Sequence, residues 1–97
     1  MKKFDEIFAQ RGEQVQPENM VKGEYYFLDR SKRSYIFNFT DVAGENIFAE
    51  YILCKSGLLI DPVQFDGRTW VVRVKGGTLS LFKATPDQVE LLNSYRV

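Results

Sequence analysis

The chain carries three cations within four residues, Arg30, Lys32 and Arg33, and tyrosines stand close to them in the sequence. Guanidinium and ammonium groups at this density can hold a phosphate or a carboxylate of a partner, and tyrosine rings can stack on nucleic-acid bases. We therefore predict a partner-binding surface made by Arg30, Lys32, Arg33, Tyr35 and Tyr26. The alternative is a solvated hairpin tip, whose basic side chains discourage edge-to-edge association of sheets.

Several kinds of chemistry are excluded by residues that the chain lacks. It has no histidine, which rules out histidine acid–base catalysis, Ser–His and Cys–His dyads and histidine-ligated metal sites. Its single cysteine cannot build a zinc or iron–sulfur site. No Walker-type phosphate loop occurs either. The sequence therefore predicts a protein without catalytic residues, without a cofactor and without a metal.

Carboxylates are the remaining candidates for catalysis, but their positions are those of turn residues. Asp41 and Glu45 flank one predicted turn, and Asp61 and Asp66 flank a segment that contains a proline. Isolated turn aspartates usually cap their own backbone, and none of these has the spacing of a calcium loop. Cys54 lies in an apolar run, where a free cysteine is most often a small buried hydrophobe.

The bulk composition is that of one small globular domain spanning residues 1–97. Thirteen basic and thirteen acidic residues cancel, so no overall field directs the chain to nucleic acid or to a membrane. The aromatic content of 14% favours a β-rich core. No apolar run approaches the ~20 residues of a membrane span, and the first residues lack the apolar core of a signal peptide. With a lone cysteine, these features predict a cytoplasmic protein.

Residues 69–83 give the strongest structural signal. Two runs of alternating apolar and polar residues flank a Gly-Gly pair that suits a two-residue hairpin turn. Counting outward from this turn predicts the opposite pairs Val74 with Leu79, Val72 with Leu81, and Trp70 with Lys83. The other face carries Arg73 and Lys75 around Val71 and Phe82, and we expect the first helix to cover it.

A second hairpin is predicted from residues 23–30 and 34–40, which are rich in strand-forming aromatics. The connection, residues 31–33, contains no glycine, so the register is open by one residue, and a slip of one exchanges the two faces. One assignment puts Tyr25, Phe27, Phe37 and Phe39 on one face, and Leu28, Ile36 and Tyr26 on the other. Both faces are apolar, which predicts a sheet covered on both sides.

Two further strands and two helices complete the plan. Residues 47–55 form a third strand, and residues 58–65 form a fourth that Asp61-Pro62 breaks or bends. Residues 2–11 place Phe4, Ile7 and Phe8 on one helical face, with Gly12 as a C-terminal cap. A second helix begins at a capping box formed by Thr85, Pro86 and Gln88, and buries Val89, Leu92 and Tyr95.

The predicted fold class is α+β, with an N-terminal helix, a curved antiparallel meander of five to six strands and a C-terminal helix. Short connections exclude parallel crossovers, and the curvature suggests a partly open barrel of SH3-like or OB-like character. We expect a non-enzymatic binding module that contacts a protein partner, as a regulator or inhibitor of a larger protein, as an accessory protein of phage type or as a homodimer. The alternative is binding of single-stranded nucleic acid or a nucleotide on the curved sheet.

Overall fold

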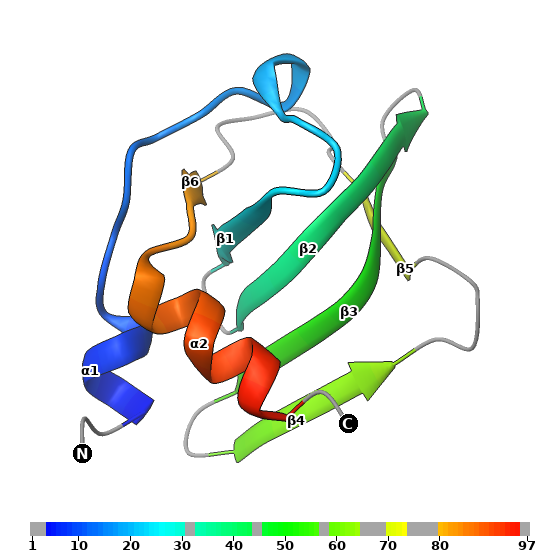
Figure 1. Ribbon diagram of the computed structural model, residues 1–97. Coiled ribbons are helices and arrows are strands. Elements are labelled where there is room, and N and C mark those ends of the chain that lie inside the picture. Colours follow the sequence, from blue (N-terminus) through cyan, green and yellow to red (C-terminus); the bar gives the residue numbers. More distant parts are fainter. Residues whose placement is uncertain are drawn as a thin grey trace.

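The computed structural model describes residues 4–30, 33–43, 46–56, 59–64, 70–73 and 80–95. The elements in chain order are α1 (Phe4–Phe8), the 3-10 helix η1 (Pro17–Asn19), β1 (Tyr25–Asp29), β2 (Ser34–Ala43), β3 (Asn46–Ser56), β4 (Leu59–Gln64), β5 (Trp70–Arg73), β6 (Ser80–Lys83) and α2 (Pro86–Tyr95). The strands form one antiparallel sheet in the order β4-β3-β2-β1-β6, and β5 also pairs with β3 (Figure 1). This confirms the α+β class. Over the described strands the sheet does not close.

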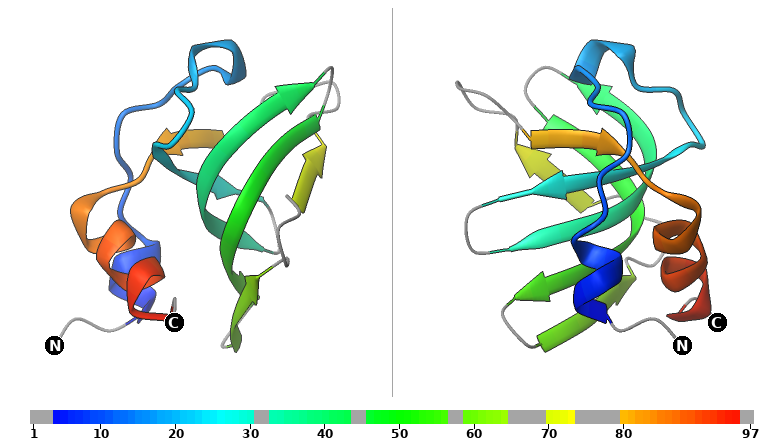
Figure 2. Two further views of the ribbon diagram at one scale, coloured as in Figure 1. Left: turned by 45° about the vertical axis from the view of Figure 1, so that its right-hand side comes forward. Right: turned by 90° about the vertical axis from the view of Figure 1, so that its left-hand side faces the viewer.

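Both faces of the sheet carry a buried cluster, as the sequence predicts. Both helices lie on one side of the sheet (Figure 2, left). The helix-side cluster consists of Phe8, Phe27, Ile36, Tyr51, Leu53 and Leu92. The opposite-face cluster consists of Tyr26, Leu28, Tyr35, Phe37, Phe39, Ile47, Ala49, Ile52 and Leu81. Val15 and Met20, from the segment of residues 10–24 that we call the lead-in, pack against this second cluster.

The structure settles the register of the first hairpin, which the sequence left open by one residue. Arg30 and Arg33 exchange both backbone hydrogen bonds, at 2.8 and 3.2 Å, so the connection between them is two residues long and not three. Tyr26 consequently pairs with Phe37, and Phe27 pairs with Ile36. The predicted assignment of side chains to faces is therefore wrong: Phe37 and Phe39 share a cluster with Tyr26 and Leu28, and Phe27 shares the helix side with Ile36.

The predicted hairpin of residues 69–83 is wrong in the part that the structure describes. β5 pairs with β3, from Ala49 opposite Trp70 onward, and β6 pairs with β1. The other edge of β6 is bonded to the lead-in, because Val15 N–H donates to Leu81 O at 3.0 Å and Lys83 N–H donates to Glu13 O at 2.8 Å. In the predicted register, β5 would instead have bonded to the backbone groups of Ser80 and Phe82, the edge of β6 that faces β1 in the structure. The turn itself, residues 74–79, lies outside the described residues.

Two register shifts bend β2 and β3. Between Phe37 and Phe39, a single residue of β2, Asn38, faces two residues of β3, and its Oδ1 accepts the Tyr51 N–H at 2.7 Å. Between Phe39 and Asp41 the extra residue is Thr40, whose buried hydroxyl oxygen has no hydrogen-bond partner in the structure. Extra residues of this kind increase local bend and twist. On the edge that does not face β2, β3 pairs with β5 before this bend and with β4 after it.

β4 is an edge strand, paired only with β3 among the described strands, and Pro62 lies within it. Proline cannot donate a backbone hydrogen bond, so an edge position is where a sheet tolerates it. The sequence predicted a broken or bent strand here, and the structure shows an uninterrupted ladder from Ser56–Leu59 to Tyr51–Gln64.

α1 ends earlier than predicted, and its last carbonyls are bonded by side chains. Gln88 Nε2 donates to Ile7 O at 3.0 Å and to Gln10 O at 2.9 Å, and Arg11 Nη1 donates to Phe8 O at 2.7 Å. Gly12 is therefore not a helix cap. It is needed because a Cβ at this position would overlap the carbonyl oxygen of Lys83, so the backbone of the lead-in approaches the end of β6 as only glycine allows.

The predicted capping box at the start of α2 is confirmed. Gln88 Oε1 accepts the Thr85 N–H at 2.9 Å, and Thr85 Oγ1 accepts the Gln88 N–H at 3.3 Å. The Thr85 hydroxyl also donates to Gln10 Oε1, and Gln10 Nε2 donates to Asp87 at 2.8 Å. Gln88 is wholly buried, so one side chain begins α2 and also holds the end of α1.

Asn38 and Thr40 should respond to substitution in opposite ways. Asn38→Ala is expected to lower the free energy of unfolding by about 1–3 kcal/mol, because the buried Tyr51 N–H loses its acceptor. Thr40→Val is expected to leave stability unchanged or to raise it by up to about 1 kcal/mol, because a side chain of similar shape removes a buried, unpaired hydroxyl. Chemical denaturation measures both, and equal losses in the two variants would contradict this account of the bends.

Gln88→Glu keeps the acceptor of the capping box but turns a carboxylate oxygen toward the two carbonyls of α1. We expect a loss of at least about 3 kcal/mol in the free energy of unfolding at neutral pH, because a buried charge faces acceptors only. Gln16→Glu is the matched control, since Gln16 is exposed and makes no capping bond, and it should stay within about 0.5 kcal/mol of the wild type. Similar values for both variants would remove Gln88 from this role.

Candidate functional site

The predicted basic site lies where β1 turns into β2. Arg30 and Arg33 are both exposed and stand directly opposite one another as a hydrogen-bonded pair. Side chains alternate between faces along a strand, so both arginines project on the same face as Leu28 and Tyr35. Within the part of the chain that the structure describes, neither guanidinium has a carboxylate partner. Lys32, the third predicted cation, lies outside the described residues.

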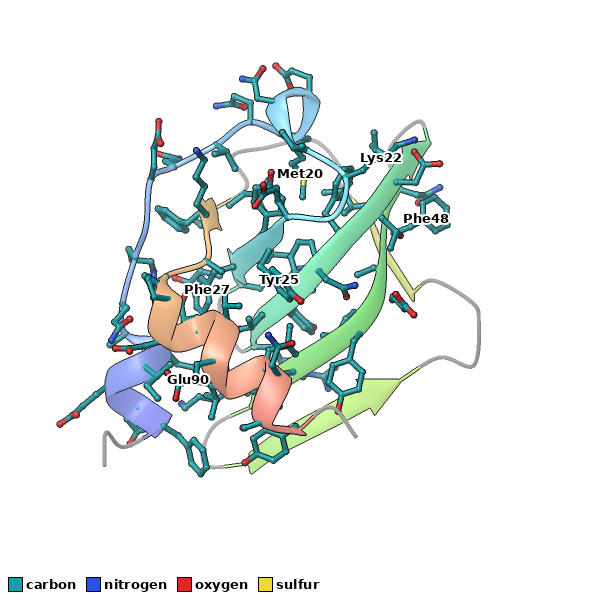
Figure 3. The ribbon with its side chains drawn as sticks, viewed as in Figure 1. Met20, Lys22, Tyr25, Phe27, Phe48 and Glu90 are labelled. Atoms are coloured by element: carbon teal, nitrogen blue, oxygen red, sulfur yellow. The ribbon has the colours of Figure 1, made fainter. Side chains whose placement is uncertain are left out.

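The predicted tyrosines do not accompany the arginines to the surface. Tyr26 and Tyr35 are 2% and 6% exposed and belong to the opposite-face cluster. Tyr25 is half-buried on the other face of β1, where it packs against the helix-side cluster (Figure 3). No tyrosine ring is therefore presented beside Arg30 and Arg33, and the structure brings these two arginines together without the predicted stacking surface.

Arg11 is a further cation near this end of β1, and its contacts are structural. Its guanidinium lies 4.5 Å from the centre of the Phe27 ring and 5.7 Å from that of Phe82. Nη2 bonds to Asp29 at 3.0 Å, on the helix side of the strand. Asp29, the carboxylate next to Arg30 in the chain, is thus paired with a cation on the other face. Among the described residues, no carboxylate neutralises the exposed arginine pair.

The candidate carboxylates do not form a catalytic arrangement. Asp41, which was predicted to flank a turn, lies in β2, where its Oδ1 accepts the N–H of Val42 at 2.8 Å and lies 3.4 Å from Lys22 Nζ. The Val42 N–H and the Lys22 ammonium lower the pKa of Asp41. Among the described residues no three Cys, Asp or Glu side chains gather as metal ligands. Glu45 and Asp66 lie outside that part of the chain.

Cys54 is half-buried and packs against the opposite-face cluster, beside its cross-strand neighbour Tyr35. On its other side, the residue opposite Cys54 is Asp61 of β4. Reactive cysteines lie beside cations, and neither cross-strand neighbour is one, so the position gives no support to a nucleophilic role.

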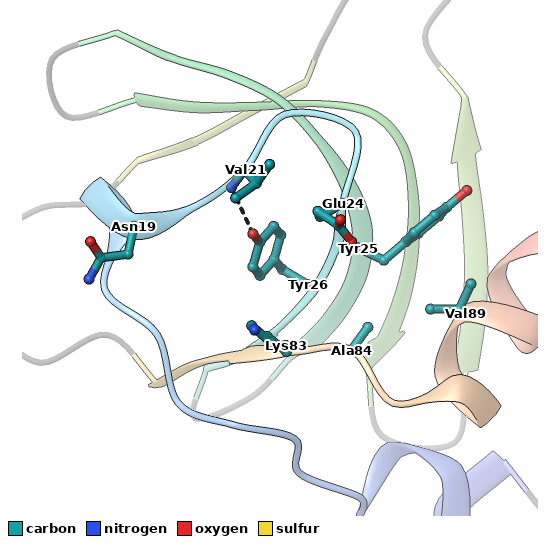
Figure 4. A pocket seen from close by; sticks show the side chains of 8 residues that line it. All are labelled: Asn19, Val21, Glu24, Tyr25, Tyr26, Lys83, Ala84 and Val89. Carbon is teal, nitrogen blue, oxygen red and sulfur yellow. Dashed lines mark hydrogen bonds between the residues drawn. The ribbon is translucent and has the colours of Figure 1, made fainter.

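The sequence did not predict the pocket at the other end of β1. It has a volume of about 260 Å³ and lies between the lead-in, the start of β1, the end of β6 and α2 (Figure 4). Its walls are formed by Asn19, Val21, Glu24, Tyr25, Tyr26, Lys83, Ala84 and Val89. The Val21 N–H donates to the Tyr26 hydroxyl at 2.8 Å, which ties the lead-in to the sheet across the pocket. The one hint in the sequence is the apolar pair Met20-Val21 inside a polar connection.

Comparison with protein-family models, with curated proteins and with solved structures finds no match for this chain. Neither of the two described helices combines the length and the hydropathy that crossing a bilayer would require.

Tyr26→Phe tests the bond that closes the pocket. It should lower the free energy of unfolding by about 1 kcal/mol, because the half-buried Val21 N–H loses its acceptor while the ring is retained. Tyr95→Phe is the matched control, since that hydroxyl has no hydrogen-bond partner in the described part of the chain, and it should change stability by less than about 0.5 kcal/mol. Equal effects in denaturant titrations would show that the Tyr26 hydroxyl does not fix the lead-in.

Proposed function

We propose that this protein is a small non-enzymatic binding module that acts through protein–protein contacts. Arg30 and Arg33 are its contact for an acidic segment of the partner, and Lys32 is a further candidate contact. The observation that carries the proposal is the exposed cross-strand arginine pair, which faces one way and has no carboxylate partner in the described part of the chain. We propose that the protein acts in this way as a regulator or inhibitor of a larger protein. We also propose that its curved sheet is related to SH3-like or OB-like barrels.

Two like charges directly opposite in an antiparallel ladder destabilise the sheet. Here the nearest carboxylate in the chain, Asp29, is bonded to Arg11 on the other face and cannot offset the repulsion. A carboxylate from a partner would offset it, and the planar guanidinium forks hold carboxylates with two parallel hydrogen bonds. Arginine is also enriched among the residues that dominate protein interfaces.

Binding of single-stranded nucleic acid has less support. Stacking platforms need exposed aromatic rings beside the cations, and Tyr26 and Tyr35 are buried. The chain has no excess of positive charge to follow a phosphate backbone. Two exposed arginines remain as the only support that this reading draws from the described residues.

The test compares a fluorescent glutamate-rich peptide with a fluorescent thymidine oligonucleotide, by anisotropy at low and at physiological salt. We expect the wild type to bind the peptide and the Arg30→Ala/Arg33→Ala variant to bind it about tenfold more weakly, as two exposed ion pairs allow. Lys22→Ala/Lys83→Ala is the matched control, because it removes the same charge near the other end of β1 and should bind as the wild type does.

Three results would overturn the proposal. They are the absence of peptide binding at low salt, equal losses in the two double variants, and binding of the oligonucleotide alone. The last result, with a steep salt dependence and a loss confined to the arginine variant, would establish the nucleic-acid alternative in its place.

A further inference from the structure

We propose that the pocket at the start of β1 binds the cationic end of one basic side chain, an arginine or a lysine of a partner protein. This site is separate from the arginine pair and takes ligands of the opposite charge. The two sites lie at the two ends of β1. The pocket includes Glu24, which precedes the strand, and the arginine pair includes Arg30, which follows it.

The size of the pocket limits the ligand. Its volume of about 260 Å³ is just below the range of roughly 300–1,000 Å³ that drug-sized ligands occupy. A single long side chain fits a space of this size better than a nucleotide or a folded loop does. Its walls are held in place by the bond from Val21 to Tyr26 and by two backbone bonds that join Gly23 and Glu24 to Phe39, at 2.9 and 2.8 Å.

The unbalanced charge of the pocket is negative. Glu24 is exposed and makes no ion pair in the described part of the chain. Lys83, the one cation in the walls, lies 3.5 Å from the carboxylate of Glu13, so its charge is already matched. Lys22, next to the pocket in the chain, is paired with Asp41. A bound cation would therefore find one free carboxylate and two lysines whose charge is already offset.

The remaining walls suit a long aliphatic stem that ends in hydrogen-bond donors. Val21 is 58% exposed, the largest exposure of any large apolar side chain in the described residues, and it stands at this pocket (Figure 4). Lysine and arginine bury their methylene stems on such surfaces and leave the charged end to polar groups. Asn19, in the walls, offers an amide oxygen as acceptor.

The test is an NMR titration of the intact chain with N-acetyl-arginine amide, with N-acetyl-citrulline amide as the neutral ligand of the same shape. We expect the arginine ligand to shift the backbone amide signals of Val21 and Glu24 and the citrulline ligand to bind at least about fivefold more weakly, the size of one exposed ion pair. Glu24→Gln should weaken binding of the arginine ligand by about the same factor. Lys83→Gln should leave it unchanged or tighten it, because it removes a like charge.

Glu24→Gln and Lys83→Gln together show whether the pocket prefers a cation or an anion, because each variant removes a charge of opposite sign. Equal binding of the two ligands, no change in Glu24→Gln, or a loss in Lys83→Gln would each overturn the proposal, and the last would mark an anion site. The Arg30→Ala/Arg33→Ala variant should bind the arginine ligand as the wild type does. A failure at the arginine pair and a failure at the pocket are thus separately visible.

Discussion

The order of the strands in the sheet depends on which segments form backbone hydrogen bonds with the two edges of β6. A strand buried in a sheet has two edges, and each edge needs partners for its backbone groups. β1 takes one edge of β6, and residues 13–15 take the other through the bonds of Val15 and Lys83. With both edges of β6 occupied, β5 pairs with β3, and over the described strands the sheet does not close.

The same contact builds the surroundings of the pocket. Because residues 13–15 run beside β6, the rest of the lead-in passes over the start of β1, where Val21 bonds to Tyr26. Gly12 permits the close approach, since any Cβ there would meet the Lys83 carbonyl. On the helix side, Gln88 fixes α1 against α2, so the lead-in leaves α1 at a defined place. The pocket is therefore a consequence of how the first quarter of the chain is attached to the sheet.

The sequence was sufficient for the elements whose signals are local. The capping box at Thr85 and Gln88 and the apolar character of both sheet faces needed only neighbouring residues, and the structure confirms them. The pairing of β5 and β6 could not be predicted from local signals, because the segment that bonds to β6, Glu13-Gln14-Val15, is distant in the chain and too short to show a strand pattern. The register of the first hairpin could not be predicted either, because its turn contains no glycine. A difference of one residue in the length of that turn changes which side chains share a face of the sheet.

In the candidate site, too, the features set by neighbouring residues could be predicted, and those set by tertiary packing could not. The sequence placed Arg30 and Arg33 together on a hairpin, which the structure confirms, but burial of Tyr26 and Tyr35 depends on tertiary packing. The pocket combines residues from positions 19 to 89, so no local pattern in the sequence could have indicated it. Burial of the Gln88 side chain was hidden for the same reason, since its second set of partners is about eighty positions away.

The most direct test of the account is the backbone pairing at β6, measured by NMR. Gln14 and Phe82 face each other as a non-hydrogen-bonded antiparallel pair, in which the Cα atoms lie about 4.5 Å apart. We expect a strong Hα–Hα nuclear Overhauser effect between Gln14 and Phe82, with slow hydrogen exchange at the amides of Val15 and Lys83. Overhauser effects that pair Val72 with Leu81 instead, with rapid exchange at Val15, would contradict it.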